Sequence, residues 1–365
     1  MAIFTDIFED VTKRGRKIPT SDYHAMGLHP IIDQGQSEIA GYTDEADGLF
    51  ADVPAIVFGD HTRVLKYVNT PCFLGADGVK LLKARIPNPN YKYLYYALSS
   101  ADIPNTGYNR HFKWLKEVNI PLPDADEQQK IVDALDKVSE LIGLRKEQLV
   151  KLDQLVKSRF IELFGDPEDS TTEWERTSFS SVCIDMHQGI NTVADKVEYV
   201  NCGLPIIQSK NITSGYLDLE DVRYVTESDY EYYRNKYNPK PSDLLVCNIG
   251  TIGKSLIVEN EVDFLIAWNL FLIKLNKESV NPIFVKVFIE LLNQQNYFEK
   301  YMTGGTVKFV NKKTMGNIST PLPPMALQEQ FATFVEQTDK SKMAIQQSLD
   351  KLELLKKSLM QEYFG

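Results

Sequence analysis

Two long stretches of this chain repeat apolar residues at alternating steps of four and three, the spacing of a helix that packs along one seam. They lie in residues 121–165 and 321–365, and we expect a long helix in each. In the first, the seam residues are Ile131, Leu135, Val138, Ile142, Arg145, Leu149, Leu152, Val156, Arg159 and Leu163. In the second, they are Phe331, Val335, Thr338, Lys342, Ile345, Leu349, Leu352, Lys356, Leu359 and Tyr363.

Each seam contains polar interruptions, and these fall at different places in the two stretches. Arg145 and Arg159 of the first align with Ile345 and Leu359 of the second, whereas the second is polar where the first is apolar. Because neither seam is complete alone, we expect the two helices to pack against each other. The alternative is two unrelated surface helices that each carry an apolar stripe.

The two stretches are also copies of each other, aligned without a gap at a constant offset of 200 residues. Pro-Leu-Pro at 121–123 matches Pro-Leu-Pro at 321–323, and Phe164-Gly165 matches Phe364-Gly365. Proline resists continuation of a preceding helix, and glycine readily takes the left-handed conformation that ends one. The repeat therefore predicts where each helix begins and ends.

The regions between the helices resemble each other more faintly. Residues 55–59 and 244–248 are both apolar runs that end in a polar loop, as expected for strands. Asn88-Pro89 and Asn281-Pro282 both precede a helical pattern, with asparagine as the N-cap and proline in the first turn. In this alignment Arg110 parallels Lys308.

Together these patterns predict an α+β protein in which two mixed α/β domains alternate with two long helices. We expect the helices to form an antiparallel coiled coil with pseudo-two-fold symmetry and the chain termini to lie close together. The expected segments are a first globular domain at 1–120, a first helical segment at 121–166, a second globular domain at 167–320 and a second helical segment at 321–365.

Composition adds little to this organisation but limits the class of protein. The 365 residues are 43% hydrophobic and 25% charged, as in globular proteins, and no apolar run approaches the roughly 20 residues that span a bilayer. The N-terminal residues show no signal peptide pattern, and four scattered cysteines suggest buried thiols in the cytoplasm. Neither cysteines nor histidines have metal-ligand spacing, so we expect no metal and no cofactor.

Three catalytic motifs are incomplete or absent in this sequence. The two Asn-Pro segments lack the second proline of the adenine methyltransferase signature, and their role as helix starts explains both. Residues 250–255 resemble the end of a P-loop, but Asn248 stands where that loop needs its first glycine. No lysine has an acidic residue two positions before it, as many restriction nucleases require. We therefore expect a chain that is not an enzyme.

The duplicated layout resembles the specificity subunits of Type I restriction–modification systems over essentially the whole chain. The resemblance is carried by the duplicated Pro-Leu-Pro before a glutamine-bearing helix start, at Gln128 and Gln328, and by the duplicated Phe-Gly stop. Shorter similar motifs are Ile31-Ile32-Asp33-Gln34-Gly35, Tyr42-Thr43-Asp44, Gly59-Asp60-His61-Thr62-Arg63 and Gly250-Thr251-Ile252-Gly253-Lys254.

The resemblance implies that each globular domain is a target-recognition domain that reads one half of a split double-stranded DNA target. The helices would set the unread spacer and dock two modification subunits, which methylate adenine with S-adenosylmethionine. Separate restriction subunits would supply translocation and cleavage. The alternatives are a coiled-coil scaffold that binds proteins but not DNA, a fused enzyme, and the specificity subunit of another multi-subunit restriction system.

Base reading in the major groove requires side chains that form paired hydrogen bonds, and phosphate contacts require Lys or Arg. In the first domain the candidates are Gln34, Gln36, His61, Thr62, Arg63, Arg110 and Lys113. In the second they are Gln188, Asn191, Lys210, Asn211, Thr251, Lys254, Lys308 and Lys312. The basic run at 13–17 either contacts the DNA backbone or is a solvated turn.

The net charge of −10 argues against nonspecific binding to nucleic acid. Residues 1–118 hold 13 basic and 14 acidic side chains, and residues 167–317 hold 15 and 20. Neither domain is basic as a whole. We therefore expect weak DNA binding by this chain alone and tight binding only beside modification subunits.

Overall fold

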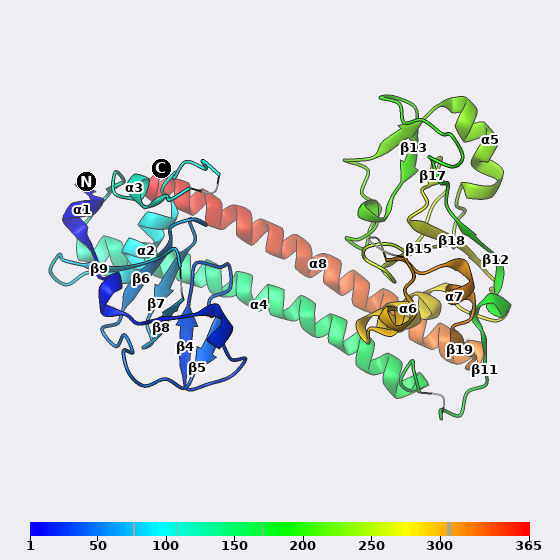
Figure 1. The fold of residues 1–365 in the computed structure, drawn as a ribbon, viewed down its shortest axis with the longest axis horizontal. Coiled ribbons are helices and arrows are strands. Elements are labelled where there is room, and N and C mark those ends of the chain that lie inside the picture. Colours follow the sequence, from blue (N-terminus) through cyan, green and yellow to red (C-terminus); the bar gives the residue numbers. More distant parts are fainter. Residues whose placement is uncertain (76, 108, 170, 305–307) are drawn as a thin grey trace. The chain divides into compact units, whose positions relative to one another are not determined.

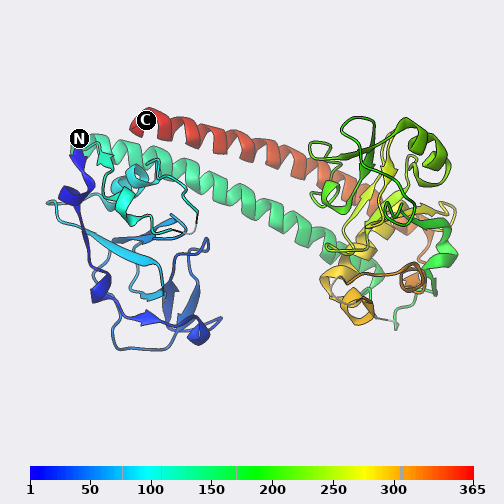
Figure 2. The same cartoon turned by 45° about the horizontal axis from the view of Figure 1, so that its top comes forward.

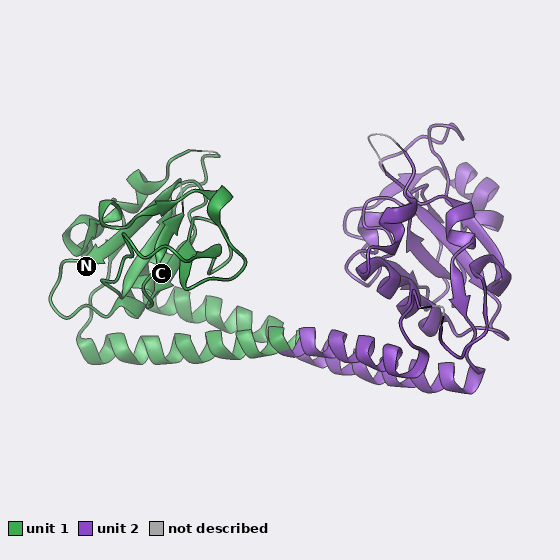
Figure 3. Cartoon of the chain, turned by 60° about the horizontal axis from the view of Figure 1, so that its bottom comes forward, with its two compact units in different colours: residues 1–147, 346–365 green, residues 148–345 purple. Residues whose placement is uncertain are grey.

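The computed structural model describes residues 1–75, 77–107, 109–169, 171–304 and 308–365. The chain divides into two compact units (Figure 3). Unit 1 comprises residues 1–147 and 346–365, and unit 2 comprises residues 148–345. Each unit therefore contains one globular region and a part of each long helix, and each is described by itself.

Unit 1 contains two four-stranded sheets and a short two-stranded one (Figure 1). The first sheet is antiparallel and has the order β2 (Phe8–Asp10), β9 (Val79–Ala84), β6 (Ala55–Gly59) and β7 (Leu65–Val68). The second has the order β3 (Lys17–Ile18), β8 (Phe73–Gly75), β4 (His29–Ile32) and β5 (Gly41–Thr43). The two-stranded sheet pairs β1 (Ala2–Ile3) with β10 (Asn119–Ile120).

Helices cover one face of the first sheet in unit 1. They are α1 (Phe4–Ile7), α2 (Tyr91–Ser99), α3 (Phe112–Leu115), the start of α4 (Ala125–Phe164) and the end of α8 (Met325–Phe364). Unit 1 also contains the 3-10 turns η1 (Thr12–Arg14) and η2 (Thr20–Asp22). The central strand β6 is buried on both faces. Ile56 and Phe58 face the helical core, whereas Ala55 and Val57 face a second core, because side chains alternate along a strand.

Unit 2 has the same kinds of sheet. Its antiparallel sheet has the order β12 (Cys183–Gln188), β18 (Leu270–Leu275), β15 (Leu244–Cys247) and β16 (Ser255–Ile257). A three-stranded sheet has the order β14 (Arg223–Val225), β13 (Leu204–Ile207) and β17 (Leu265–Ile266), and β11 (Arg176–Ser178) pairs with β19 (Ser319–Pro321). The helices are α5 (Glu227–Tyr237), α6 (Pro282–Gln294), α7 (Lys312–Gly316), η3 (Phe179–Val182), η4 (Ser209–Asn211) and η5 (Tyr297–Tyr301).

Strand pairing shows that the globular regions are duplicates. β6 pairs antiparallel with β7 and β9, and β15 pairs antiparallel with β16 and β18. β4 pairs antiparallel with β5 and parallel with β8, as β13 does with β14 and β17. The predicted duplication of a mixed α/β domain is confirmed. α5 is an addition to unit 2 without a counterpart among the helices described in unit 1.

The long helices are antiparallel in each unit. In unit 1 the early residues Ile131 and Leu135 of α4 share a core with the late residue Leu359 of α8. In unit 2 the late residue Phe160 of α4 lies 5.5 Å from the early residue Phe331 of α8, measured between ring centroids. No predicted seam residue is exposed, which confirms the seam.

The duplicated helix ends behave as the sequence predicts. The side-chain amide of Gln128 donates to the carbonyl of Pro123 at 2.9 Å, and Gln328 donates to the carbonyl of Pro323 at 2.8 Å. Gly165 follows the last residue of α4 with a left-handed φ of +82°. The two termini both belong to unit 1 and lie near each other in Figures 1 and 2.

The two Asn-Pro segments differ in how they start their helices. Asn281 caps α6 by accepting from the backbone N–H of Ile283, with Pro282 in the first turn, as predicted. In unit 1 the prediction is wrong in detail, because α2 is capped by Asn90, whose side chain accepts from the N–H of Tyr93. Asn88 has a φ of +47° and lies before the helix.

Candidate nucleic-acid interface

Three segments of unit 1 that carry predicted DNA contacts are hydrogen-bonded into one surface. Gln34 joins the segment after β4 to the turn between β6 and β7. Its side-chain oxygen accepts from the N–H of His61 at 3.2 Å, and its carbonyl accepts from the hydroxyl of Thr62 at 2.6 Å. The structure thus brings these predicted residues together. Gln34 and Thr62, however, bond to each other's segments and so stabilise the surface instead of presenting free groups to DNA.

The same turn is fastened to the segment that precedes α3. The guanidinium of Arg63 donates to the carbonyl of Ile103 at 3.0 Å, and Nδ1 of His61 lies 3.2 Å from the carbonyl of Asn109. The carbonyl of Asp60 accepts from the N–H of His111 at 2.7 Å, and its carboxylate accepts from the N–H of Phe112 at 2.8 Å. These contacts set the position of Arg110 between them.

Among the described residues of this surface, two predicted readers keep free polar groups. Gln36 and Arg110 are exposed, and neither side chain has a hydrogen-bond or ion-pair partner in the described part of the chain. Lys113 is exposed and its ammonium lies 4.0 Å from the centre of the Trp114 ring. Paired hydrogen bonds to a base edge are open to Gln36 and Arg110, and a phosphate contact is open to Lys113.

The corresponding surface of unit 2 is built around the loop between β15 and β16. The carbonyl of Asn248 accepts from the N–H of Val310 at 3.0 Å, and the N–H of Asn248 donates to the carbonyl of Asn269 at 3.2 Å. The side-chain amide of Gln188 donates to the carbonyl of Trp268 at 3.0 Å. Gln188 is therefore half-buried and partly committed, although it borders this surface.

Three predicted residues of unit 2 have structural partners. The carboxamide oxygen of Asn191 accepts from the N–H of Ala194 at 3.2 Å and so forms a turn. Lys210 is exposed but pairs with Asp221 at 2.5 Å, and this contact lowers the pKa of Asp221. The hydroxyl of Thr251 lies against the thiol of Cys247.

Asn211 corrects the sequence interpretation. Its side chain is only 2% exposed. Its oxygen accepts from the N–H of Gln208 at 3.0 Å, and its amide donates to the carbonyls of Asp218 and Asp221 at 3.1 and 3.2 Å. Because all of its polar groups are satisfied internally, Asn211 builds the loop and is removed from the candidates.

Lysines provide the free cations of the unit 2 surface. Lys254, Lys308 and Lys312 are exposed and have no ion pair with another described residue. The predicted parallel of Arg110 with Lys308 is one residue out of register. The N–H of His111 donates to the carbonyl of Asp60, as that of Val310 donates to the carbonyl of Asn248, so Arg110 is equivalent to Phe309. The sequence alignment missed this because the segments that precede the two residues differ in length.

Two residues of this surface escaped the sequence analysis. Trp268 is 37% exposed, and its ring lies 5.7 Å from that of Phe309. A partly exposed aromatic pair beside polar loops can contact bases or sugars. The available signal was a tryptophan followed by an asparagine in a turn between two apolar strands, which sequence patterns more often place in a core.

Two of the four basic side chains in the run at 13–17 form ion pairs within unit 1. Arg14 lies 3.2 Å from Glu9, and Arg16 lies 2.9 Å from Glu45. All four side chains are partly exposed, so these pairs stabilise the fold only slightly. The two arginines therefore fit the solvated-turn interpretation, whereas the exposed Lys13 and Lys17 are still available for a contact with the DNA backbone.

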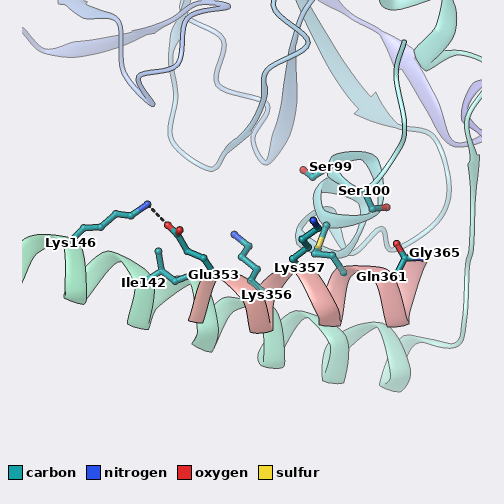
Figure 4. Close-up of a pocket in the computed structure, with 10 residues that line it drawn as sticks. Ser99, Ser100, Ile142, Lys146, Glu353, Lys356, Lys357, Gln361 and Gly365 are labelled. Atoms are coloured by element: carbon teal, nitrogen blue, oxygen red, sulfur yellow. Dashed lines mark ion pairs between the residues drawn. The ribbon is translucent and has the colours of Figure 1, made fainter. Parts of the chain in front are cut away.

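Outside these surfaces, unit 1 has a cavity of about 470 Å³ between the end of α2 and the two long helices. In it Lys146 extends to Glu353, with 2.9 Å between ammonium and carboxylate (Figure 4). Among the described residues, no group of three or more His, Cys, Asp or Glu side chains is arranged to hold a metal ion. No helix in the same part of the chain is long and apolar enough to cross a membrane.

Comparison with known proteins finds a family model described as the Type I restriction modification DNA specificity domain, which matches residues 4–154 and 173–354. The specificity subunit of the Type I restriction enzyme EcoR124I/EcoR124II from Escherichia coli is 23% identical and spans 95% of this chain and 88% of its own length. The EcoBI specificity subunit, also from Escherichia coli, is 23% identical over 75% of this chain and 65% of its own.

Solved structures share the fold. The crystal structure of a Type-I restriction-modification system S subunit from M. genitalium superimposes with a TM-score of 0.59 at 15% identity. A chain from work on complex assembly and conformational transition of the type I R-M system gives 0.55 at 17% identity. In both cases all of this chain and 95% of the other are covered.

Proposed function

The chain belongs to the family of Type I restriction modification DNA specificity domains, and from this premise we propose that it is the DNA-reading subunit of a Type I restriction–modification complex. Each globular region reads one half of a bipartite double-stranded target. The long helices set the spacer and dock two modification subunits, and restriction subunits join that assembly. The chain supplies no catalytic residue, and methylation and cleavage come from those partners. We place this activity in the cytoplasm.

The observation that carries this proposal is a duplicated scaffold with dissimilar side chains on equivalent loops. The same strand order supports the 60–64 turn in unit 1 and the 248–254 loop in unit 2. The first surface offers Gln36 and Arg110, whereas the second offers Lys254, Lys308 and Lys312. A reader of two different half-targets needs this combination, because the scaffold fixes the approach to DNA and the side chains choose the bases.

We propose the same segment limits that the sequence suggests. The target-recognition domains are residues 1–120 and 167–320, and the helical segments are 121–166 and 321–365. Helices α4 and α8 begin four residues inside these helical segments, after the Pro-Leu-Pro sequences. The family match also occurs twice, once in each half of the chain.

The long helices carry apolar side chains that their own pairing leaves exposed. On α4 these are Leu141, Leu144, Val150, Leu155 and Ile161, and on α8 they are Met343, Leu354 and Leu355. Exposed apolar residues that recur along a helix favour a protein partner. This supports docking of the modification subunits on the helices. A scaffold that binds proteins only would leave the duplicated polar surfaces without a role.

Charge supports shared rather than independent DNA binding. The two globular regions have net charges of −1 and −5, so neither attracts a polyanion as a whole. We expect the isolated chain to bind DNA weakly at physiological salt. Modification subunits would supply the remaining backbone contacts.

The decisive experiment is coexpression of the chain with the modification subunits of its own host, followed by long-read mapping of N6-methyladenine in plasmid DNA. The expected result is methylation at a split motif with two short specified halves and a fixed gap. Replacing residues 167–317 with the equivalent region of another family member should change one half only. A stably assembled complex that methylates no defined motif would contradict the proposed function.

A further inference from the structure

Unit 1 contains a buried lysine directly beneath the segment that carries Gln36. The side chain of Lys66, on β7, is 2% exposed. Its ammonium donates to the carbonyl of Ser37 at 2.5 Å and lies 3.4 Å from the carboxylate of Asp33. That carboxylate also accepts from the N–H of Gly35 at 2.8 Å. One ammonium therefore joins both ends of the 33–37 segment.

An ammonium at this depth needs an explanation other than stability. Lysine is almost never fully buried unless it is paired, and a buried ion pair often stabilises a fold no better than apolar side chains of similar volume. Where such a pair is retained, a common role is to select one conformation over others. The conformation selected here is that of the 33–37 segment.

The second unit shows that the scaffold does not need a charge at this position. Gly59 and Cys247 are equivalent, because each donates its N–H across the turn, to Val64 and Lys254 respectively, at 2.8 Å. Two residues further along, Lys66 is therefore equivalent to Leu256. Leu256 packs against an apolar core of unit 2. The same sheet position thus accepts leucine.

The second unit also shows what replaces the lysine. The segment after β13, equivalent to the segment after β4, is closed by Gln208 and Asn211, whose side chains cap each other's backbone N–H groups. That segment holds its shape through its own side chains. The 33–37 segment is instead held by a side chain from β7.

We infer that Lys66 is a positioning residue for the reading of the first half-target. By fixing both ends of the 33–37 segment, it orients Gln36 toward the base edges, while Gln34 fastens the same segment to the 60–64 turn. Lys66 contacts no DNA itself. This inference rests on the proposed function and names a determinant of specificity within it.

Lys83 provides a matched control in the same unit. It lies on β9 with a side chain 13% exposed, and its ammonium donates to the carboxylate of Asp52 at 2.9 Å and to the carbonyl of Pro54 at 3.0 Å. It therefore also ties a loop to a strand through a mostly buried ammonium. The loop that it holds carries none of the candidate base-reading residues.

The test uses full-length Lys66→Met and Lys83→Met chains, each coexpressed with the modification subunits, and maps N6-methyladenine for the two halves separately. The half read by unit 1 is the one that replacement of 167–317 leaves unchanged. For Lys66→Met, we expect methylation at sites with one wrong base in that half to rise by about tenfold relative to cognate sites, since one paired base contact gives discrimination of this order. Methylation at sites with one wrong base in the other half should not rise. Lys83→Met should leave the specificity of both halves unchanged.

Each contrary outcome is informative. An unchanged motif for Lys66→Met, or equal relaxation of both halves, would overturn the positioning role while leaving the proposed function intact. If Lys66→Met does not assemble, Asp33→Asn/Lys66→Met removes both charges and should restore assembly with a relaxed first half. Failure of this double variant to fold would make Lys66 a requirement of the fold and overturn the inference. Only a wild-type complex without a motif would contradict the proposed function.

Discussion

Arg63 and Gly253 occupy the same place in the two units, and both have a left-handed backbone, with φ of +64° and +79°. The N–H of Arg63 donates to the carbonyl of Gly59 at 2.7 Å, and that of Gly253 donates to the carbonyl of Cys247 at 2.9 Å. The turn that carries predicted DNA contacts thus ends in a left-handed residue in both copies, although the loop in unit 2 is two residues longer. In unit 1 a non-glycine residue accepts this strain while its guanidinium holds Ile103.

Replacing Gly253 with alanine should destabilise unit 2. Alanine would be strained by the left-handed φ at this position, and its Cβ would lie 2.7 Å from Cβ of Asn293. We expect a loss of about 1–3 kcal/mol in the free energy of unfolding, measured by urea titration. Gly143→Ala is the matched control, since it has open space around its Cβ within α4 and should stabilise the helix by about 0.5–1 kcal/mol. Equal effects of both changes would contradict this account.

Arg110→Ala should weaken target binding by the complex with modification subunits and relax one half of the motif. The guanidinium is exposed and has no partner among the described residues, so the loss should reflect DNA contacts rather than folding. A paired contact to a base corresponds to about 1–3 kcal/mol, or at least several-fold in affinity. Fluorescence anisotropy with cognate and single-substituted duplexes measures both effects. Arg14→Ala, which removes an ion-paired arginine, should leave binding unchanged.

Lys356→Leu should stabilise unit 1, because Lys356 is a polar interruption of the helix seam that aligns with Val156. Burial, and then repulsion from Lys146, lower the pKa of Lys356 below its ordinary 10.5. Between the lowered folded pKa and 10.5 the unfolded chain binds more protons, so wild-type stability should rise with pH through this window. The leucine variant should therefore gain on the order of 1 kcal/mol at neutral pH. This gain should shrink as the pH approaches 10.5, and urea unfolding at a series of pH values measures it. A gain that does not depend on pH would contradict the lowered pKa of Lys356.

Thiol reactivity should single out Cys202. It is exposed, whereas burial raises the pKa of Cys72 to about 11 and that of Cys183 to about 12. Burial likewise raises the pKa of Cys247 to about 11. A disulfide reagent at neutral pH should modify one thiol quickly and the other three only after denaturation. Cys202→Ser should abolish the fast phase, and its persistence would refute this assignment.

Local patterns in the sequence were sufficient to predict the long helices and the duplication. A seam at steps of four and three can bury its apolar residues only in a long helix, and a gapless repeat requires a second one. The strand at 55–59 could equally be predicted from the sequence, since a short run of apolar residues before a polar loop is typical of a buried strand. The helix start at Asn90 was missed because two asparagines flank one proline, and the sequence does not record that Asn88 has a left-handed φ of +47° before the helix.

The sequence by itself thus determined the architecture, the helix limits and the loops that carry the candidate contacts. Only the tertiary structure decided which polar side chains in those loops are free. Gln34 and Gln36 are two residues apart and alike in type, yet one is bonded to the 60–64 turn and the other is exposed. Asn211 and Lys66 are likewise committed by partners in other segments or strands. Buried polar groups must be satisfied, and their partners come from wherever the fold brings them, so no local pattern records the choice.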